Sequence, residues 1–226
     1  MAAFAFAFAD ALPKGKVMLI SNGIKVIGCL TMLVGVHPLI AYGVVGLGAA
    51  AYSPAKYGIL TEYLPHPKLV IANGWIEGLT VGSIILGTLL GGALISERFS
   101  AVLLRIDLPF IDTGIDTAPE IAITLIVAFY IIAAVFNVYI PKTGAEHRPA
   151  HSNPVALVTD FARCLRLLWA DKLGQISLAT TTLFWGAGAT LQFIVLKWAQ
   201  IALGYTLSQA TILQGITAVG IAAGAV

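Results

Sequence analysis

Long apolar runs separated by short polar stretches dominate the chain. Four of them reach the length of about 20 residues that a helix needs to cross the hydrocarbon core of a bilayer, and a fifth is nearly as clear. The pattern predicts an all-α membrane protein with about seven membrane segments, of which five are complete. The complete segments are Val17–Val36, Leu39–Leu60, Leu69–Ile95, Ile121–Ile140 and Ile176–Leu203, and shorter apolar pieces lie at Ala2–Ala9 and Leu207–Val226.

Composition agrees with a chain that lies mostly in lipid. Of the 226 residues, 58 % are hydrophobic and 11 % are charged, and the mean hydropathy is +0.91, whereas soluble domains carry about 25 % charged residues. The net charge of +2 is small and its residues are scattered, which argues against a nucleic-acid partner. Cys29 and Cys164 lack the spacing of a metal site or a disulfide framework, so both are expected to be packing residues.

Both ends of the chain lie in apolar sequence. The residues after Met1 lack the basic region and the cleavage site of a signal peptide, and the last apolar run continues to Val226 without a polar tail. We therefore expect this chain to be a fragment of a longer protein.

Basic residues are distributed unevenly between the two sides on which the connecting loops alternate. Eight fall in loops 10–16, 61–68 and 141–175, and two fall in the loops of the other side. Because cytoplasmic loops are enriched in Lys and Arg, loop 141–175 is predicted to be cytoplasmic. Its second half, Val155–Trp169, has apolar residues at helical spacing beside two arginines. This spacing predicts an amphipathic helix on the inner leaflet, and the alternative is an ordinary linker between two bundles.

Polar residues inside or beside the apolar runs are candidates for function, because such groups are costly in lipid. Lys25 lies ~12 Å from the predicted cytoplasmic end of its helix at 1.5 Å per residue, where a functional role and snorkelling to the surface both fit. Lys56 follows Pro54, and a proline frees a backbone carbonyl and can open polar groups to a cavity, so a functional role is favoured. The remaining polar residues of this kind are Asn22, Glu62, Asn73, Glu77, Gln192 and Lys197.

Two acidic residues stand near these lysines. Glu62 and Glu77 lie on the predicted cytoplasmic side of neighbouring helices, where each could pair with Lys25 or Lys56. Capping of a helix end is favoured for Glu62, and the role of Glu77 stays open.

Glycines recur at spacings that let membrane helices approach closely. The pairs Gly78 and Gly82, Gly87 and Gly91, and Gly220 and Gly224 are each four residues apart, and Gly43, Gly46 and Gly48 line the second complete segment. We expect these stripes to be packing faces, which would also give a moving bundle smooth contact surfaces.

Catalytic and metal-binding patterns are absent from the sequence. It contains none of the short motifs of zinc hydrolases, serine hydrolases, nucleotide-binding loops or acyltransferases. Pro149 between His147 and His151 argues against a helical metal pair. No catalytic residue, metal or cofactor is therefore expected, and transport is the default function for a protein with several membrane segments.

Four stretches resemble one known family. They are ADALPKGKVMLISNGIK from Ala9, GAAAYSPAKYGIL from Gly48, KLVIANGWIE from Lys68 and SLATTTLFWGAGATLQF from Ser177. They are similar to the bacterial lysophospholipid transporter family of the major facilitator superfamily, and the likeness extends over nearly the whole chain. The SPAKYGIL block is the most specific part of it.

This resemblance implies a truncated helical bundle of the superfamily's twelve-helix fold. Residues 1–140 would be the remainder of the N-terminal six-helix bundle, with helices two to six. Residues 141–175 would be the cytoplasmic loop between the bundles, with its amphipathic helix. Residues 176–226 would begin the C-terminal bundle, with helices seven and eight.

The resemblance also implies a function at the bacterial inner membrane. The family moves lysophosphatidylethanolamine and related lipids to the cytoplasmic leaflet, where a partner acyltransferase–acyl carrier protein synthetase restores the second chain. The alternatives are a superfamily exporter of drugs or small metabolites, the membrane module of an acyltransferase fusion, and a non-functional fragment.

Site residues follow from the matching blocks. Lys56 matches a lysine assigned to the lipid headgroup, and Glu77 matches an acid of the family. Gln192 stands where the family has an arginine, which removes a cation suited to phosphate. The expected substrate-binding residues are Lys56, Glu77, Lys25, Gln192 and Asn73, and the expected gating or structural residues are Asp10, Lys14, Lys16, Pro54 and Glu62.

Overall fold

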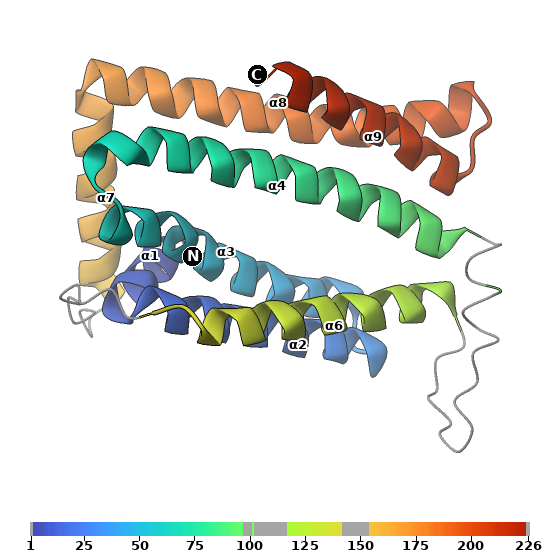
Figure 1. The fold of residues 1–226 in the computed structure, drawn as a ribbon, viewed down its shortest axis with the longest axis horizontal. Helices are drawn as coiled ribbons and strands as arrows, with labels where there is room; N and C mark the ends of the chain where they lie inside the picture. The colour runs from blue at the N-terminus through green and yellow to red at the C-terminus, as the bar shows by residue number, and fades with distance from the viewer. Residues whose placement is uncertain (1, 97–100, 102–116, 142–153, 225–226) are drawn as a thin grey trace. The chain divides into compact units, whose positions relative to one another are not determined.

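The computed structural model describes residues 2–96, 101, 117–141 and 154–224, and every regular element among them is an α-helix. Figure 1 shows these helices in chain order. They are α1 (Ala2–Ala11), α2 (Lys14–Leu33), α3 (Pro38–Tyr63), α4 (His66–Ile95), α6 (Ala118–Val138), α7 (Pro154–Ala170), α8 (Lys172–Ala202) and α9 (Leu207–Gly224).

Five of these helices, α2, α3, α4, α6 and α8, are long and apolar enough to cross a membrane. They coincide with the five complete segments expected from the sequence, so the predicted helical membrane protein is confirmed. The largest difference at a helix start is in α8, which begins at Lys172 instead of Ile176, and α2 begins at Lys14 instead of Val17. Both helices therefore start with lysines that the apolar pattern had placed in loops.

The chain divides into two compact units, which are described separately. Unit 1 contains Met1–Asn73 and Ile123–Leu165, and unit 2 contains Gly74–Ala122 and Arg166–Val226. The division into bundles at residues 140 and 176 remains a prediction from the sequence.

In unit 1, α2 and α3 pack along most of their length. The helices approach closely at two glycines. A Cβ atom at Gly28 would lie 2.9 Å from the Val45 nitrogen, and one at Gly48 would lie 2.7 Å from the Ser21 carbonyl oxygen. Small residues at such crossings allow the close packing that holds membrane helices together, because the hydrophobic effect does not drive helices together in lipid. Of the predicted stripe, only Gly48 is thus a packing position, with Gly28 of α2 as its counterpart. A Cβ atom at Gly43 or Gly46 would meet no atom within 4 Å, so the stripe as a whole is not a packing face of unit 1.

Replacing Gly48 by alanine is expected to destabilise the protein by roughly 1–3 kcal/mol, because the added methyl group would push α3 away from the α2 backbone. The matched control is Gly46→Ala, since a Cβ atom there meets no atom within 4 Å. Thermal unfolding in detergent, followed by the helical signal in far-ultraviolet circular dichroism, measures both. An equal response of the two variants would contradict the close crossing.

In unit 2, α8 packs against α9. Gln214 of α9 donates a hydrogen bond through Nε2 to the main-chain oxygen of Gln192, at 2.7 Å. Gly92 of α4 lies against Thr211, and Gly215 lies against Leu89. A Cβ atom added at any of the paired glycines of α4, Gly78 with Gly82 and Gly87 with Gly91, would meet no atom within 4 Å outside its own turn of the helix, so their role as packing faces remains a prediction.

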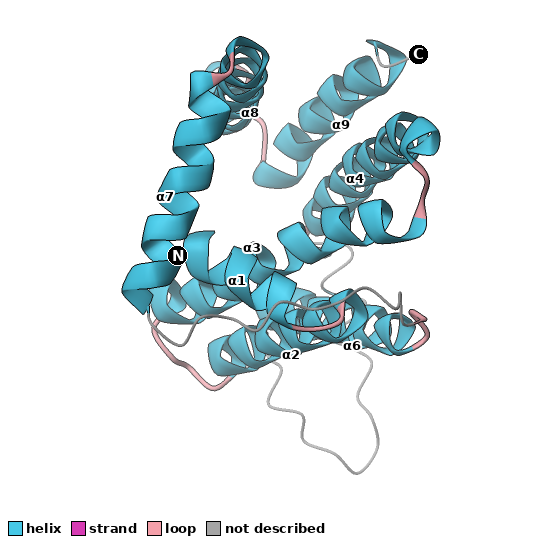
Figure 2. Ribbon diagram, turned by 90° about the vertical axis from the view of Figure 1, so that its left-hand side faces the viewer, coloured by secondary structure: helices cyan, strands magenta, loops and turns pink. Residues whose placement is uncertain are grey.

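The amphipathic helix predicted for Val155–Trp169 is present as α7, and it is the most amphipathic of the described helices. Figure 2 shows its junction with α8. Asp171 caps α8 by accepting a hydrogen bond from the Gly174 nitrogen at 2.9 Å, and Gln175 donates through Nε2 to the Trp169 oxygen at 2.6 Å. Cap and turn contacts of this kind fix the angle at which one helix leaves the other. The placement of α7 on the inner leaflet stays a prediction.

Candidate functional site

A buried lysine joins the ends of three helices in unit 1. Lys14 Nζ lies 2.9 Å from Asp10 Oδ1 at the end of α1 and 3.7 Å from Glu62 Oε1 near the end of α3. It also donates a hydrogen bond to the Ala9 oxygen at 2.8 Å. The Lys14 side chain is 7 % exposed, whereas those of Asp10 and Glu62 are 69 % and 16 % exposed. Two carboxylates therefore surround one sheltered ammonium group.

Local sequence explains how this lysine fits. Pro13 separates α1 from α2, so Lys14 stands at the first position of α2, four residues after Asp10. A Cβ atom at position 58 would lie 3.1 Å from Lys14 Cε. Gly58 thus leaves room on α3 for the lysine stem. Lys16 is exposed and lies with Lys14 on a small pocket of about 240 Å³ that α2 shares with the end of α6.

The second buried lysine, Lys25, lies between three helices of unit 1. Its Nζ atom is 4.2 Å from the ring centroid of Tyr52 on α3 and 5.2 Å from that of Tyr130 on α6. It donates a hydrogen bond to Asn22 Oδ1 at 3.2 Å. Because Lys25 is only 8 % exposed, its amine stays inside the unit, and the snorkelling alternative is wrong for this structure.

Two buried polar atoms beside Lys25 have no hydrogen-bond partner among the described residues. They are Ser21 Oγ and Asn22 Nδ2. Buried donors are satisfied in nearly all proteins, and leaving one unpaired costs about 1–3 kcal/mol. This part of unit 1 therefore has unused hydrogen-bonding capacity next to a cation.

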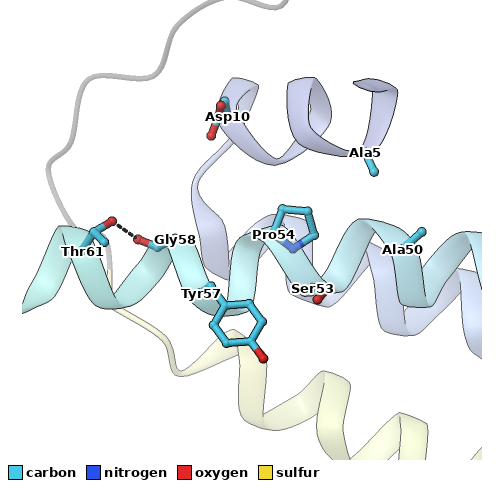
Figure 3. A pocket seen from close by; sticks show the side chains of 8 residues that line it. All are labelled: Ala5, Asp10, Ala50, Ser53, Pro54, Tyr57, Gly58 and Thr61. Atoms are coloured by element: carbon cyan, nitrogen blue, oxygen red, sulfur yellow. Dashed lines mark hydrogen bonds between the residues drawn. The ribbon is translucent and has the colours of Figure 1, made fainter. Parts of the chain in front are cut away.

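Lys56 is partly buried on α3, and its Nζ atom lies 4.7 Å from the ring centroid of Tyr57. About three turns of the same helix, including Pro54, line a cavity of about 690 Å³. Figure 3 shows this cavity between α3 and α1, with Asp10 near one end. The cavity wall is largely apolar apart from Asp10, Ser53 and Thr61. Pro54 lies inside α3, where it withholds a backbone donor, as the sequence predicted.

The remaining predicted site residues are divided between the units. Asn73 belongs to unit 1 and is exposed, whereas Glu77 is partly buried and Gln192 is exposed in unit 2. Their relation to Lys56 therefore remains a prediction. Within the described ranges, no three His, Cys, Asp or Glu side chains gather in a way that could hold a metal ion.

Sequence reasoning missed two aromatic residues of unit 1. Tyr52 and Tyr130 attract little notice in apolar helices, because tyrosine is a common packing residue there. One signal pointed to Tyr52, since it precedes Lys56 by four residues and therefore shares its helix face. No comparable signal identified Tyr130. Glu62 was expected to cap a helix or to pair with Lys25 or Lys56, and sequence reasoning did not foresee that Lys14 also lies beside it.

The chain is similar to curated proteins over its whole length. Among curated proteins, the chain is similar to the lysophospholipid transporter LplT of Yersinia enterocolitica serotype O:8 / biotype 1B, with 39 % identity over 226 residues. It is 38 % identical, over 226 residues, to LplT of Yersinia pestis (strain Pestoides F) and of Yersinia pseudotuberculosis serotype O:3 (strain YPIII). Each match covers 100 % of this chain and 51 % of the relative, so the chain spans about half the length of the curated relatives it matches. No solved structure matches it.

A family match covers the same residues. The sequence profile of the Major Facilitator Superfamily matches residues 1–226, and the described helices have the length and apolar character of membrane spans. The family expected from the sequence is therefore confirmed: this chain is a multi-pass membrane protein that belongs to the Major Facilitator Superfamily of transporters.

Proposed function

We propose that the protein is a lysophospholipid transporter of the bacterial inner membrane. It moves lysophosphatidylethanolamine and related lipids toward the cytoplasmic leaflet, where they are reacylated. The observation that carries this proposal is the 38–39 % identity, over all 226 residues, to proteins named lysophospholipid transporter. The superfamily match supports transport as the general activity.

The substrate sets two requirements. A lysophospholipid has an anionic phosphate in its headgroup and one acyl chain, so the headgroup needs a polar site while the chain stays in contact with lipid. Lys56 supplies a cation on a helix that contains a proline, and we assign the phosphate to it. Glu77 is assigned to the headgroup ammonium or to orienting Lys56.

The cavity between α1 and α3 offers a largely apolar wall of about 690 Å³ beside this helix. Its lining residues, among them Pro54 and Tyr57, lie on the turns of α3 that carry Lys56. A lipid chain that entered there would bring its headgroup close to α3. The cavity thus suits the apolar part of the substrate.

The cluster of Asp10, Lys14 and Glu62 supports a gating role. Its ion pairs link the ends of α1, α2 and α3, on the side that the basic residues predict to be cytoplasmic. Transporters of this kind expose their site alternately by moving helices against each other. We propose that these ion pairs hold one of the two states, with Lys16 at the exposed rim.

Two further parts of the proposal concern phosphate binding and the partner enzyme. Gln192 stands where the lysophospholipid transporter family has an arginine. Because glutamine carries no positive charge, phosphate binding in this protein would depend more strongly on Lys56. An acyltransferase–acyl carrier protein synthetase is proposed as the partner that uses the delivered lipid. Co-purification of that enzyme with the protein from membranes would test this part alone.

The proposed function is tested by transport itself. Liposomes containing the protein should take up fluorescent or radioactive lysophosphatidylethanolamine faster than liposomes without protein, and should not take up a diacyl phosphatidylethanolamine. The matched control is the same protein after heat inactivation. Equal uptake with and without protein would overturn the proposal, and uptake of drug-like cations instead would favour an exporter.

A further inference from the structure

The amine of Lys25 occupies an aromatic site built by two other helices. Tyr52 of α3 and Tyr130 of α6 present their rings to Nζ at 4.2 and 5.2 Å. Ring faces attract cations, most strongly where water is excluded, and Lys25 is 8 % exposed. The structure thus shows that this site accommodates a primary alkylammonium group, here the protein's own.

The same site lacks an anion. None of the ion pairs formed by the described residues includes Lys25. Asn22 Nδ2 and Ser21 Oγ have no partner in the described parts of the chain, and these side chains are 2 % and 0 % exposed. A cation and two sheltered polar groups without acceptors form a site that an anionic oxygen would complete.

A phosphoethanolamine headgroup carries both the missing anion and an ammonium group of the kind that the rings already hold. Its phosphate oxygens accept hydrogen bonds from Lys25 and Asn22, and its primary ammonium group is chemically the same as the lysine amine that now rests on the rings. Lys56 stands one turn from Tyr52 on the same face of α3, ~6 Å along the axis. That spacing suits the two-carbon arm that joins phosphate to ammonium in ethanolamine.

We propose that Tyr52 and Tyr130 form the ammonium subsite of the transporter, and that Lys25 fills this subsite when no substrate is bound. This inference rests on the proposed function and adds a headgroup preference to it, and it gives the two rings the ammonium role that was one of the two options for Glu77. When the headgroup enters, its ammonium takes the ring faces and Lys25 turns to the phosphate. One ammonium group contacts the rings before the exchange and one contacts them after it. The rings are therefore never without a cation, and the two ammonium groups do not repel each other there.

The rings would then distinguish lipids by headgroup. A phosphoglycerol headgroup carries the same phosphate but no ammonium, so it cannot replace Lys25 on the rings. Loss of a ring should therefore weaken binding of the ethanolamine lipid and leave the glycerol lipid unaffected. A merely structural tyrosine would affect both lipids alike.

The test compares KM for uptake of lysophosphatidylethanolamine and lysophosphatidylglycerol by the protein in liposomes. Tyr52→Leu is expected to raise KM for the ethanolamine lipid by about tenfold and to leave KM for the glycerol lipid within about twofold of wild type. Tyr52→Phe keeps the ring face and should retain the wild-type preference. Tyr139→Leu is the control, because that tyrosine is 78 % exposed.

Several results would overturn the subsite. An equal rise of KM for both lipids would show that Tyr52 acts only in packing, and a loss of preference in Tyr52→Phe would assign the effect to the hydroxyl group. If Tyr52→Leu does not reach the membrane, the pair Tyr130→Leu and Tyr130→Phe gives the same comparison. Wild-type protein that moves neither lipid would overturn the proposed function, whereas wild-type uptake with unchanged selectivity in the leucine variants would overturn this subsite alone.

Discussion

Replacing Lys56 by alanine is expected to reduce lysophospholipid uptake by about tenfold to a hundredfold, at an unchanged amount of protein in the membrane. A charge-assisted hydrogen bond to phosphate contributes about 1.5–3 kcal/mol, and Gln192 cannot supply the missing positive charge. Initial uptake rates in liposomes, normalised to reconstituted protein, measure the effect. The change should appear in both KM and the maximal rate, because the phosphate must be held while the helices move.

The matched control for this experiment is Lys68→Ala. Lys68 is an exposed residue in the first turn of α4, so its replacement removes the same charge without touching α3. Lys56→Arg should keep part of the activity, because the charge remains while the geometry changes. Wild-type uptake by Lys56→Ala would exclude the phosphate role of this lysine.

Replacing Lys14 by methionine is expected to lower the melting temperature of the protein by roughly 5–10 °C. The substitution deprives Asp10 and Glu62 of a shared cation and the Ala9 oxygen of its donor. Removing one partner of a fully buried pair costs about 3–5 kcal/mol. Because Asp10 is 69 % exposed, we expect a smaller loss of about 2–3 kcal/mol.

Three comparison variants locate this effect in the cluster. Asp10→Asn should lower the melting temperature less than Lys14→Met, since water already solvates its carboxylate, and Lys16→Met should have no effect, because Lys16 is exposed. Adding Glu62→Gln to Lys14→Met should restore part of the stability, because it removes one of the two carboxylates that have lost Lys14. A Lys14→Met protein as stable as wild type would contradict the buried ion pairs.

Helix positions were largely predictable because their signal is local. A run of about 20 apolar residues can satisfy its backbone in lipid only as a helix, so Ile121–Ile140 was recognisable without any knowledge of its neighbours. The amphipathic character of α7 is equally local, since apolar residues at a period of 3.6 lie on one face of any helix they form. The start of α2 was missed because Lys14 is polar, and polarity was taken as the mark of a loop.

The candidate site was predictable only in part. Lys25 and Lys56 could be identified because charged residues in apolar runs are rare and costly. Their partners could not, because contacts such as those of Lys25 with Tyr52 and Tyr130 join residues that are far apart in the sequence. The approach of Lys14 to Glu62 likewise depends on which face of α3 meets the start of α2.

By itself, the sequence determined that this protein lies in a membrane, how many complete spans it has, and which family it resembles. Each of these follows from the residue content of continuous stretches. Only the tertiary structure decided that Gly28 and Gly48 mark the crossing of α2 and α3, and that Lys25 rests on two aromatic rings. The physical reason is that a helix face is fixed by its own residues, whereas the partner it meets is fixed by the packing of all helices in the unit.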